Sequence, residues 1–287
     1  MEARKPEWLR VRRPGRGSWG AVRRALGEKR LHTVCEEARC PNRAECWGAG
    51  TATLLLLGDV CTRGCAFCSV ARGVPLPPDP DEPARVARLA DELQLEYVVL
   101  TSVSRDDLPD GGAELFARAI DAVHALPRHP RVEVLIPDYR GASLAAVVGA
   151  RPGVLAHNLE VVRRLGPLVR HPRCDYERSL GTLAEARRLA PGLTTKSSVL
   201  LGLGETRDEV LEAMHDLRGA GVDVLVLGQY LRPTVRNVEV SRYVAPEEFA
   251  ALRERGLAAG FRSVVAAPLA RTSYHARETA GKIGARR

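Results

Sequence analysis

Six of the seven cysteines in this 287-residue chain lie in two triplets within thirty-four consecutive residues. Two neighbouring groups of three thiols are hard to explain by packing in a hydrophobic core. Thiolates are the usual protein ligands of iron–sulfur clusters, and three thiolates leave one iron of a four-iron cluster for another ligand. We therefore expect each triplet to wrap around a metal group. The first triplet comprises Cys35, Cys40 and Cys46, and the second comprises Cys61, Cys65 and Cys68.

The composition predicts one well-packed domain in a reducing compartment. With 287 residues, 45% of them hydrophobic, the chain is long enough for one substantial core. Its apolar runs of five to eight residues are far shorter than the ~20 residues that span a bilayer, so we expect no membrane association. Residues 1–20 lack the apolar segment of a secretory signal and indicate a transit peptide only weakly. We expect a cytoplasmic protein, in which clustered cysteines bind metal or catalyse rather than form disulfides.

Positive charge is concentrated at the two ends of the chain. The net charge is +8, and residues 1–30 carry ten Lys or Arg against three Asp or Glu. Residues 271–287 carry five against one, which leaves the middle slightly acidic. Basic ends suggest an anionic partner, although solvated arms without a partner are an equally good interpretation. Because no nucleic-acid-binding motif is present, we expect no nucleic acid partner, and an acidic protein domain fits the charge.

Short apolar segments alternate with segments of helical periodicity after the first triplet. The apolar segments are rich in Val and Leu and almost continuous, which is typical of parallel strands covered on both faces. Repeated strand–helix units predict an α/β fold, either a parallel barrel or a doubly wound sheet, with fewer repeats than a complete barrel. We expect strands at 51–58, 97–102, 132–137, 153–158, 197–204, 222–228 and 261–268. We expect helices at 80–94, 111–126, 158–169, 179–190, 206–221 and 246–260.

Polar motifs follow the predicted strands at their carboxyl ends. In parallel α/β folds these ends form a common rim, where ligand sites gather. The loop that carries the second triplet, CTRGCAFC, follows the first of the strands and is expected on the same rim. The other motifs are TSVSRDDLPDGG, IPDYRG, AHNLE, LGLGE and LGQYLRP, at 101–112, 136–141, 156–160, 201–205 and 227–233.

The loop of the second triplet is short enough to wrap three thiolates around one face of a cluster. We expect Gly64 to relieve backbone strain in this loop, and Phe67 to shield the cluster from solvent. The alternative is a structural zinc site, which needs a fourth protein ligand. The first triplet also lacks such a ligand, because no His lies at zinc-finger spacing. We interpret the seventh cysteine, Cys174, as a small apolar bystander.

The second triplet, spaced C-x3-C-x2-C, resembles the signature of the radical S-adenosylmethionine (SAM) superfamily. The first triplet, the rim motifs and the element RTSYHA together resemble lipoyl synthases, colinearly from about Thr33 to Ala276. The resemblance implies a partial (β/α)6 TIM-like barrel, with an N-terminal cysteine-rich extension and a C-terminal segment that closes on the barrel mouth. It divides the chain into a basic arm with the first triplet, a radical SAM core, and a C-terminal segment with a basic tail, at 1–50, 51–267 and 268–287.

The resemblance implies two 4Fe–4S clusters, SAM and a sulfurtransferase reaction. The first triplet would bind an auxiliary cluster with Ser273 as its fourth ligand; the family motif around Ser273 more often has Ser where Thr272 stands. The second triplet would bind the catalytic cluster and SAM, so its three cysteines and Ser273 are the implied catalytic residues. Cleavage of SAM would give a radical that abstracts hydrogen from C6 and C8 of an octanoyl chain. The auxiliary cluster would donate the two sulfur atoms and be consumed. Taken without the resemblance, Ser273 would be interpreted as part of a C-terminal turn.

The implied partners follow from this reaction. The octanoyl chain would be linked to a Lys of a lipoyl carrier domain or of the glycine-cleavage H protein. Such domains are commonly acidic, which fits the basic ends of this chain. A donor of the ferredoxin or flavodoxin type would supply electrons, and an iron–sulfur carrier would repair the auxiliary cluster.

The resemblance also implies that the motif at the end of the second predicted strand contacts SAM. Asp106, Asp107, Gly111 and Gly112 stand where superfamily members contact the amino group of SAM. The structural alternative is a turn followed by a helix N-cap, because Asp and Gly favour both.

Later rim motifs supply weaker candidates. Asn158 and Glu160 would contact the ribose of SAM, or Asn158 would cap a following helix. Lys196 is either exposed or paired with a carboxylate of SAM or of a substrate, because an unpaired buried Lys is costly. Arg271 would hold Ser273 or a carboxylate by charge-assisted hydrogen bonds. The remaining candidates are Gly202, Gly204 and Glu205 in a turn near SAM, and Gln229 and Tyr230 at the acyl cavity or packed in the core.

Two other functions are alternatives. One is a different sulfur-inserting radical SAM enzyme, such as a relative of biotin synthase or a methylthiotransferase, against which the first triplet and the RTSYHA element argue. The other is a basic zinc-binding adaptor without catalysis.

Overall fold

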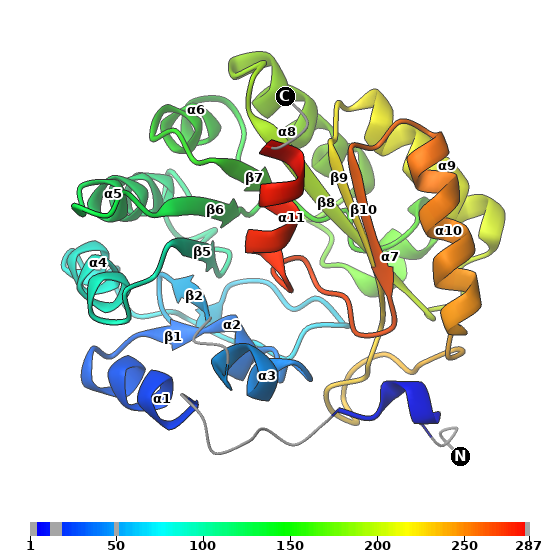
Figure 1. Ribbon diagram of the computed structural model, residues 1–287, viewed down its shortest axis with the longest axis horizontal. Coiled ribbons are helices and arrows are strands. Elements are labelled where there is room, and N and C mark those ends of the chain that lie inside the picture. The colour runs from blue at the N-terminus through cyan, green and yellow to red at the C-terminus, as the bar shows by residue number, and fades with distance from the viewer. Residues whose placement is uncertain (1–4, 12–18, 49–51, 285–287) are drawn as a thin grey trace. The chain divides into compact units, whose positions relative to one another are not determined.

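The computed structural model describes residues 5–11, 19–48 and 52–284. It divides into two compact units, which we describe separately (Figure 1). The N-terminal unit comprises Val11–Gly64 and Ser69–Leu155, and the C-terminal unit comprises Met1–Arg10, Cys65–Cys68 and Ala156–Arg287. Residues 1–4, 12–18 and 49–50 of the segment predicted at 1–50, and residues 285–287 of the basic tail, lie outside the described residues.

The N-terminal unit contains four neighbouring sheet strands in the order β1-β2-β5-β6. Strands β2, β5 and β6 are parallel, with Thr53 opposite Val99 and Tyr97 opposite Arg131, whereas β1 runs antiparallel to β2. All four residues of β2 are buried, which explains its continuous apolar sequence. A separate parallel pair, β3 with β4, carries the start of the second cysteine triplet. The strand bounds are His32–Thr33, Thr53–Leu56, Val60–Cys61, Ala71–Arg72, Tyr97–Ser102 and Arg131–Leu135 for β1 to β6.

Three helices, α4, α5 and α6, lie side by side along this sheet (Figure 1). Helix α4 begins with Glu82 followed by Pro at the first turn, and the buried Glu82 carboxylate accepts a hydrogen bond from the Leu57 N–H at 2.9 Å. Helix α5 begins after two glycines with positive φ, and its first N–H groups bond to Asp110. Helix α6 was not predicted. The helices of this unit are α1 Trp19–Glu28, α2 Val34–Glu37, α3 Arg43–Gly48, α4 Glu82–Glu92, α5 Ala113–His124 and α6 Gly141–Gly149.

The C-terminal unit contains three parallel strands in the order β8-β9-β10. Val224 of β9 lies opposite Lys196 of β8 and Ser263 of β10. The chain passes from one unit to the other within β7 (Val154–Ala156). The strands are β8 Thr194–Leu201, β9 Val224–Gln229 and β10 Ser263–Ala267. The helices are η1 Glu7–Leu9, η2 Arg163–Leu165, α7 Gly166–Val169, α8 Tyr176–Leu189, α9 Arg207–Gly219, α10 Pro246–Ala258 and α11 Ala276–Gly284.

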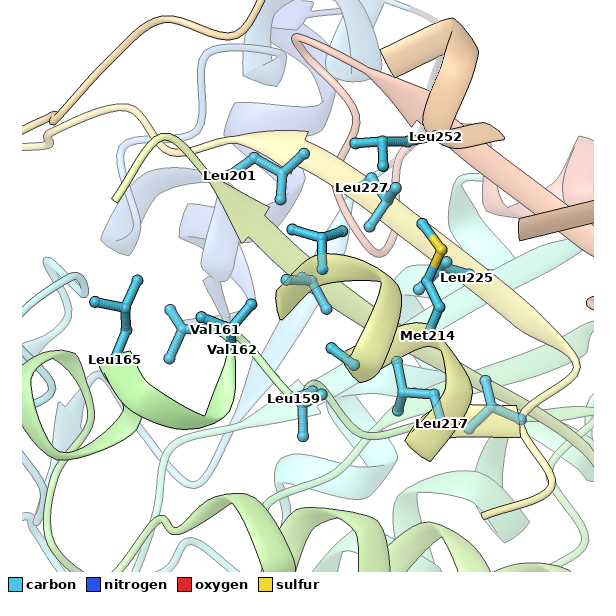
Figure 2. Close-up of a cluster of buried hydrophobic side chains, with 14 of the residues drawn as sticks. Leu159, Val161, Val162, Leu165, Leu201, Met214, Leu217, Leu225, Leu227 and Leu252 are labelled. Atoms are coloured by element: carbon cyan, nitrogen blue, oxygen red, sulfur yellow. The ribbon is translucent and has the colours of Figure 1, made fainter. Parts of the chain in front are cut away.

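The core of the C-terminal unit is a cluster of buried hydrophobic side chains, to which the strands and α9 contribute (Figure 2). Met214 and Leu217 of α9 face Leu225 and Leu227 of β9, in keeping with the helical spacing of the apolar residues. Burying each such side chain contributes about 1.5–3 kcal/mol. Phe67 of the second triplet packs against this cluster, so the core also anchors the segment 65–68.

The predicted α/β class and the parallel strands are confirmed, and every predicted strand overlaps an observed one. The predicted helix at 158–169 is wrong. Glu160 instead forms a parallel bridge with Val199, and only the short elements η2 and α7 follow. Among the described residues, no helix is long and apolar enough to cross a membrane.

Candidate active site and metal centres

The first cysteine triplet is held in a compact turn between two short helices of the N-terminal unit. Cys35 lies in α2 and Cys46 in α3, and the Cys40 N–H bonds to the Cys35 carbonyl at 3.1 Å. The three thiols are close enough to interact electrostatically. Burial, followed by the neighbouring Cys35 and Cys40, raises the pKa of Cys46 to about 12. The structure therefore brings the three predicted ligands of the first triplet together.

Cys35 is buried and lies among hydrogen-bond donors. Burial raises the pKa of its thiol. The N–H and hydroxyl of Thr53, which bond to the sulfur, and the neighbouring Trp47 lower it. Thr33 caps the helix that carries Cys35 by accepting from the Glu36 N–H at 3.3 Å. Donors aimed at a buried sulfur stabilise its thiolate form, as they do around metal ligands. The first triplet thus fits an iron–sulfur cluster, and the roles of Trp47 and Thr53 were not predicted.

A cluster of three ionisable side chains, which was also not predicted, lies next to the first triplet. Side-chain atoms of His32, Glu37 and Asp59 lie within 4.8 Å of one another. Burial, and then repulsion from Asp59, raises the pKa of Glu37, whereas His32 lowers it. The hydroxyl of Ser69 donates to the Glu37 carbonyl at 2.6 Å. This bond ties helix α2 to the chain that follows the second triplet.

The first half of the CTRGCAFC loop belongs to the N-terminal unit and is anchored to the loop after β5. The Thr62 N–H and hydroxyl both donate to the Ser104 carbonyl, at 3.1 and 2.9 Å. The Gly73 N–H donates to the Cys61 carbonyl at 3.1 Å. The sulfur of Cys61 accepts from the Arg63 N–H at 3.4 Å. These bonds fix the direction in which Cys61 leaves β3.

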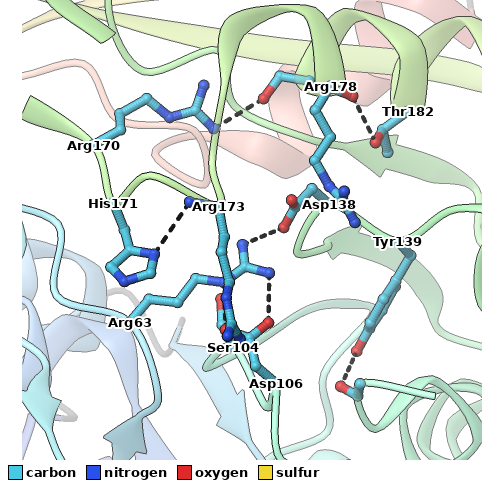
Figure 3. Close-up of polar contacts among 12 residues, drawn as sticks. Arg63, Ser104, Asp106, Asp138, Tyr139, Arg170, His171, Arg173, Arg178 and Thr182 are labelled. Atoms are coloured by element: carbon cyan, nitrogen blue, oxygen red, sulfur yellow. Dashed lines mark hydrogen bonds and ion pairs between the residues drawn. The ribbon is translucent and has the colours of Figure 1, made fainter. Parts of the chain in front are cut away.

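Arg63, between two ligand cysteines, is the centre of a nearly buried ion network (Figure 3). Its guanidinium donates to both carboxylate oxygens of Asp106, at 2.8 and 2.7 Å. It also donates to Asp138 at 2.5 Å. The side chain of Arg63 is 9% exposed and that of Asp138 is 3% exposed. A forked, buried guanidinium positions its partners strongly, so Arg63 joins the cysteine loop to the loops that follow β5 and β6.

The two predicted SAM contacts Asp106 and Asp107 both hold arginines in this structure. Asp106 holds Arg63, and Asp107 accepts hydrogen bonds from Arg105 at 2.9, 3.2 and 2.7 Å. Arg105 lowers the pKa of Asp107. Arg105 also donates to the Leu57 carbonyl at 3.2 Å. Their assignment to SAM stays a prediction.

Gly111 and Gly112 form the turn that was the structural alternative for this motif. Their φ angles are +65° and +85°, a region that suits glycine. A Cβ at Gly112 would lie 2.3 Å from the side chain of Leu57. The Tyr139 hydroxyl donates to the Gly111 carbonyl at 3.0 Å, and Asp110 caps α5. The helix-capping role therefore belongs to Asp110.

Cys65 and Cys68 belong to the C-terminal unit, where backbone bonds hold their segment. The Ala66 N–H donates to the Val169 carbonyl at 2.8 Å. The Asn237 side chain donates to the Ala66 and Cys68 carbonyls at 3.1 and 2.8 Å. The Cys68 N–H donates to the Cys65 carbonyl at 3.1 Å. The second triplet thus has a fixed backbone on either side of Gly64, which fits a cluster-binding loop.

We expected Gly64 to relieve backbone strain in the cysteine loop, and the structure does not support this. The φ of Gly64 lies outside the positive region, and a Cβ there would come within 2.7 Å of the Arg72 side chain. A larger residue there would need only a movement of the flexible, exposed Arg72 side chain, so neither backbone conformation nor packing requires glycine at this position.

The interpretation of Cys174 as a bystander is wrong. Its side chain is hydrogen-bonded to that of Cys65, and this bond is the largest cause that raises the pKa of Cys65. The Cys65 sulfur also accepts from the His171 N–H at 3.3 Å. Sequence spacing gave no indication of this contact, because it joins residues more than one hundred positions apart.

The C-terminal unit brings Asn158, Glu160, Arg271 and Thr272 together. The Thr272 hydroxyl donates to the Asn158 side chain at 3.0 Å, and Asn158 donates to Glu160 at 3.1 Å. Burial raises the pKa of Glu160, and Arg170 and Arg271 counteract it. Asn158 therefore does not cap a helix. Ser273 follows in the turn Arg271–Tyr274, and its ligation of the auxiliary cluster stays a prediction.

The structure also limits the possible roles of Lys196, Gly202 and Glu205. Lys196 is 2% exposed, so the exposed alternative is wrong. The Glu205 carboxylate accepts from the N–H groups of Gly202 and Leu203, at 2.6 and 2.9 Å. The turn that was expected near SAM is therefore fixed by its own glutamate, and its contact with SAM stays a prediction.

Gln229 and Tyr230 act in packing. The Gln229 side chain donates to the Arg242 carbonyl at 3.1 Å and accepts from the Val244 N–H at 2.8 Å. The Tyr230 hydroxyl donates to the Val238 carbonyl at 2.8 Å. Both side chains anchor the segment 231–244 to the end of β9, which favours the packing alternative.

Comparison with known proteins supports this description. A model of the radical SAM superfamily matches residues 55–217. A lipoyl synthase of Anaeromyxobacter sp. (strain Fw109-5) is 57% identical over 281 residues, 97% of this chain and 95% of the relative. The lipoyl synthase of Thermus thermophilus is 51% identical, over 96% of this chain and 86% of the relative. That of Pyrobaculum calidifontis is 54% identical, over 95% of each chain.

Two solved structures share the fold at low sequence identity. The FeFe-hydrogenase maturase HydG of Carboxydothermus hydrogenoformans superposes with a TM-score of 0.61 at 15% identity, over 80% of this chain and 56% of that one. Methylornithine synthase (PylB) gives a TM-score of 0.56 at 13% identity, over 88% of this chain and 83% of that one. These likenesses confirm the predicted fold class, an α/β arrangement of mostly parallel strands. The chain is an enzyme, a sulfurtransferase, and it belongs to the lipoyl synthase family of the radical SAM superfamily.

Proposed function

We propose that this enzyme inserts two sulfur atoms, at C6 and C8, into the octanoyl chain of a protein-bound N6-octanoyl-lysine to give the lipoyl cofactor. The observation that carries the proposal is the first triplet, in which three thiols converge and Cys35 is surrounded by donors. A radical SAM enzyme that only generates a radical has no need of a second thiolate site. Near-full-length identity to lipoyl synthases supports the same reaction.

Family membership implies an iron–sulfur cluster and SAM, and we propose two clusters. Their proposed ligands are the second triplet for the catalytic 4Fe–4S cluster, and the first triplet with Ser273 for the auxiliary one. When bound, these groups supply the electron that cleaves SAM and the sulfur that enters the product. We further propose functional segments at 1–50, 51–267 and 268–287.

The side chains of the enzyme position these groups. The donors around Cys35 hold its sulfur as a thiolate ligand. Arg63 fixes the cysteine loop through Asp106 and Asp138. The hydrogen bond from Thr272 to Asn158 holds the segment that carries the proposed ligand Ser273.

Contacts with SAM are proposed for the polar residues at the strand ends. Glu160, whose buried carboxylate is bonded to Asn158, suits a hydroxyl or ammonium group of SAM. The full proposed set is Asp106, Asp107, Gly111, Asn158, Glu160, Lys196 and Arg271.

The proposed partners are proteins. The basic ends of the chain suit an acidic octanoylated lipoyl carrier domain or the glycine-cleavage H protein. A ferredoxin- or flavodoxin-type donor would reduce the catalytic cluster, and an iron–sulfur carrier would restore the auxiliary one. We propose a cytoplasmic location, where both kinds of partner operate.

The test combines metal analysis with a single turnover under anaerobic conditions. The protein is mixed with SAM, dithionite and an octanoylated lipoyl-domain peptide. We expect about eight irons per chain, 5′-deoxyadenosine and a dithiolated peptide. About four irons, with deoxyadenosine but no sulfur on the peptide, would leave radical SAM chemistry and remove the lipoyl reaction.

A Ser273→Cys variant tests the auxiliary ligand. Thiolate is a softer ligand than alkoxide and holds iron more firmly. We expect this variant to keep its iron and its ability to form deoxyadenosine but to lose sulfur insertion. Wild-type amounts of lipoyl product from the variant would contradict the assignment of Ser273.

A further inference from the structure

A thiol outside both triplets lies against a proposed cluster ligand. Within the C-terminal unit the side chain of Cys174 is hydrogen-bonded to the side chain of Cys65. Both residues are half-buried, and so within reach of small oxidants. The two side chains come from segments that are distant in sequence, so their contact is a product of the fold.

The backbone around the two thiols keeps them in contact. The turn between α7 and α8 is closed by the Cys174 N–H, which donates to the His171 carbonyl at 2.7 Å. The Arg173 N–H donates to the ring of His171 at 3.3 Å, as Figure 3 shows. In the same turn, the His171 N–H donates a hydrogen bond to the Cys65 sulfur at 3.3 Å. The turn therefore curls around Cys65, and Cys174 lies at its end.

The turn is also fixed at both ends. Before it, the Val169 carbonyl accepts from the Ala66 N–H at 2.8 Å. After it, Asp175 caps α8 by accepting from the Arg178 N–H at 2.6 Å. Two side chains in hydrogen-bonding contact lie near the separation that a disulfide requires, and the fixed turn keeps them there.

We propose that Cys65 and Cys174 form a disulfide in the cluster-free enzyme when a low-molecular-weight disulfide of the glutathione type acts as oxidant. The proposal rests on the proposed function, in which Cys65 is an iron ligand of the catalytic cluster. The disulfide withdraws that ligand, so that the catalytic site takes up no cluster until a thiol reductant opens the bond. It also protects the ligand sulfur from irreversible oxidation to sulfinic acid.

The exchange balances with one molecule of oxidant. One protein thiolate attacks a sulfur of glutathione disulfide and forms a mixed disulfide, and one glutathione thiolate leaves. The second protein thiolate then attacks the protein sulfur of that mixed disulfide, and a second glutathione thiolate leaves. The two protons of the protein thiols pass to the two glutathione thiolates. The protein pair is oxidised by two electrons, and the glutathione disulfide is reduced by two.

The experiment maps disulfides in the cluster-free full-length enzyme. The protein is equilibrated anaerobically with reduced and oxidised glutathione in graded ratios, alkylated, and digested with trypsin without reduction. We expect the peptide Gly64–Arg72 joined to the peptide Cys174–Arg178, with fragmentation placing the bond at Cys65. The bond should persist in a Cys68→Ser variant and disappear in a Cys174→Ser variant.

A second readout follows iron uptake. The oxidised wild-type protein is expected to take up about half the iron of the reduced protein, because only the first triplet remains available. Dithiothreitol should restore the full amount, and the Cys174→Ser variant should take up the full amount before and after glutathione treatment. A bond between Cys65 and Cys68 with Cys174 alkylated, or glutathione adducts alone, would overturn the proposal. Neither readout uses SAM or an octanoyl substrate, so a failure of the lipoyl reaction is separable from a failure of this proposal.

Discussion

Replacement of Arg63 by Gln should destabilise the cluster-free protein strongly, although the residue lies in a loop. Its guanidinium makes three hydrogen bonds to two carboxylates that are 17% and 3% exposed. The change leaves these carboxylates without their cation, and removing one partner of a buried ion pair costs about 3–5 kcal/mol. We expect a loss near the lower end, about 3 kcal/mol, because the Asp106 side chain is 17% exposed and remains partly solvated.

The size of the effect should depend on geometry as well as on charge. Arg63→Lys keeps the positive charge but loses the forked contact, and should cost about 1–2 kcal/mol. The double variant Arg63→Gln/Asp138→Asn should recover part of the loss, because the most buried carboxylate is then neutral. The matched control is Arg253→Gln, which breaks a pair whose side chains are 50% and 68% exposed and should cost less than about 0.5 kcal/mol.

The assay is urea unfolding of the reduced, cluster-free protein, followed by circular dichroism and by Trp fluorescence, because coincident transitions are needed for a two-state free energy. A second readout is the yield of 5′-deoxyadenosine per SAM after cluster loading, which should fall in Arg63→Gln because the cysteine loop loses its anchor. If Arg63→Gln unfolds within about 0.5 kcal/mol of the wild type, the positioning role of the network is refuted.

Three further substitutions test separate parts of the structure. Gly202→Ala should cost at least about 2 kcal/mol in urea unfolding, because φ is +96° and the new Cβ would meet the Gln229 side chain; a neutral result would show that the turn relaxes freely. Glu209, bonded to Arg164, has its pKa lowered to about 2 from 4.5, so its stabilising effect is present above about pH 4.5 and is lost as pH falls towards 2. Glu209→Gln should flatten that part of the stability–pH curve, and an unchanged curve would contradict it. Trp47→Phe removes the indole that lowers the pKa of Cys35 and so favours its thiolate form; the change should lower the iron content of the auxiliary site while the catalytic site keeps its iron.

Local sequence patterns predicted the strands well. The segment at 97–102 is a strand over those same residues, because a continuous run of Val and Leu suits a position that is covered on both faces. The predicted strand at 197–204 begins earlier, at Thr194, because polar Thr, Lys and Ser residues there are buried as well. The start of this strand was therefore not predicted, because its residues are polar.

The wrong helix at 158–169 shows how tertiary contacts override periodicity. Apolar residues recur there at helical spacing, but the Glu160 N–H and carbonyl bond to Ser198 and Leu200 of β8, at 3.0 and 2.7 Å. This pairing holds Glu160 at a φ of +69°, which no helix allows. The hydrogen bonds come from a strand nearly forty residues away, so no local window of sequence contains them.

The candidate site also contains residues that local sequence predicted and residues that it did not predict. Cysteine spacing identified both triplets, because the ligands of one cluster lie close together in sequence. The partners that position them were missed, since Trp47, Asp138 and Cys174 act through contacts that exist only in the folded chain. Asp138 did stand in a rim motif, IPDYRG, so the motif was the one available indication of its role.

The measurement that tests the central claim most directly follows the sulfur itself. The clusters of the wild-type enzyme are rebuilt with sulfide enriched in a heavy isotope, and one turnover is run on an octanoylated lipoyl-domain peptide in unlabelled buffer. We predict that both sulfur atoms of the lipoyl product carry the heavy isotope, and that Cys35→Ala gives deoxyadenosine but no sulfur on the peptide. Unlabelled sulfur in the product, or a normal product from Cys35→Ala, would contradict the account.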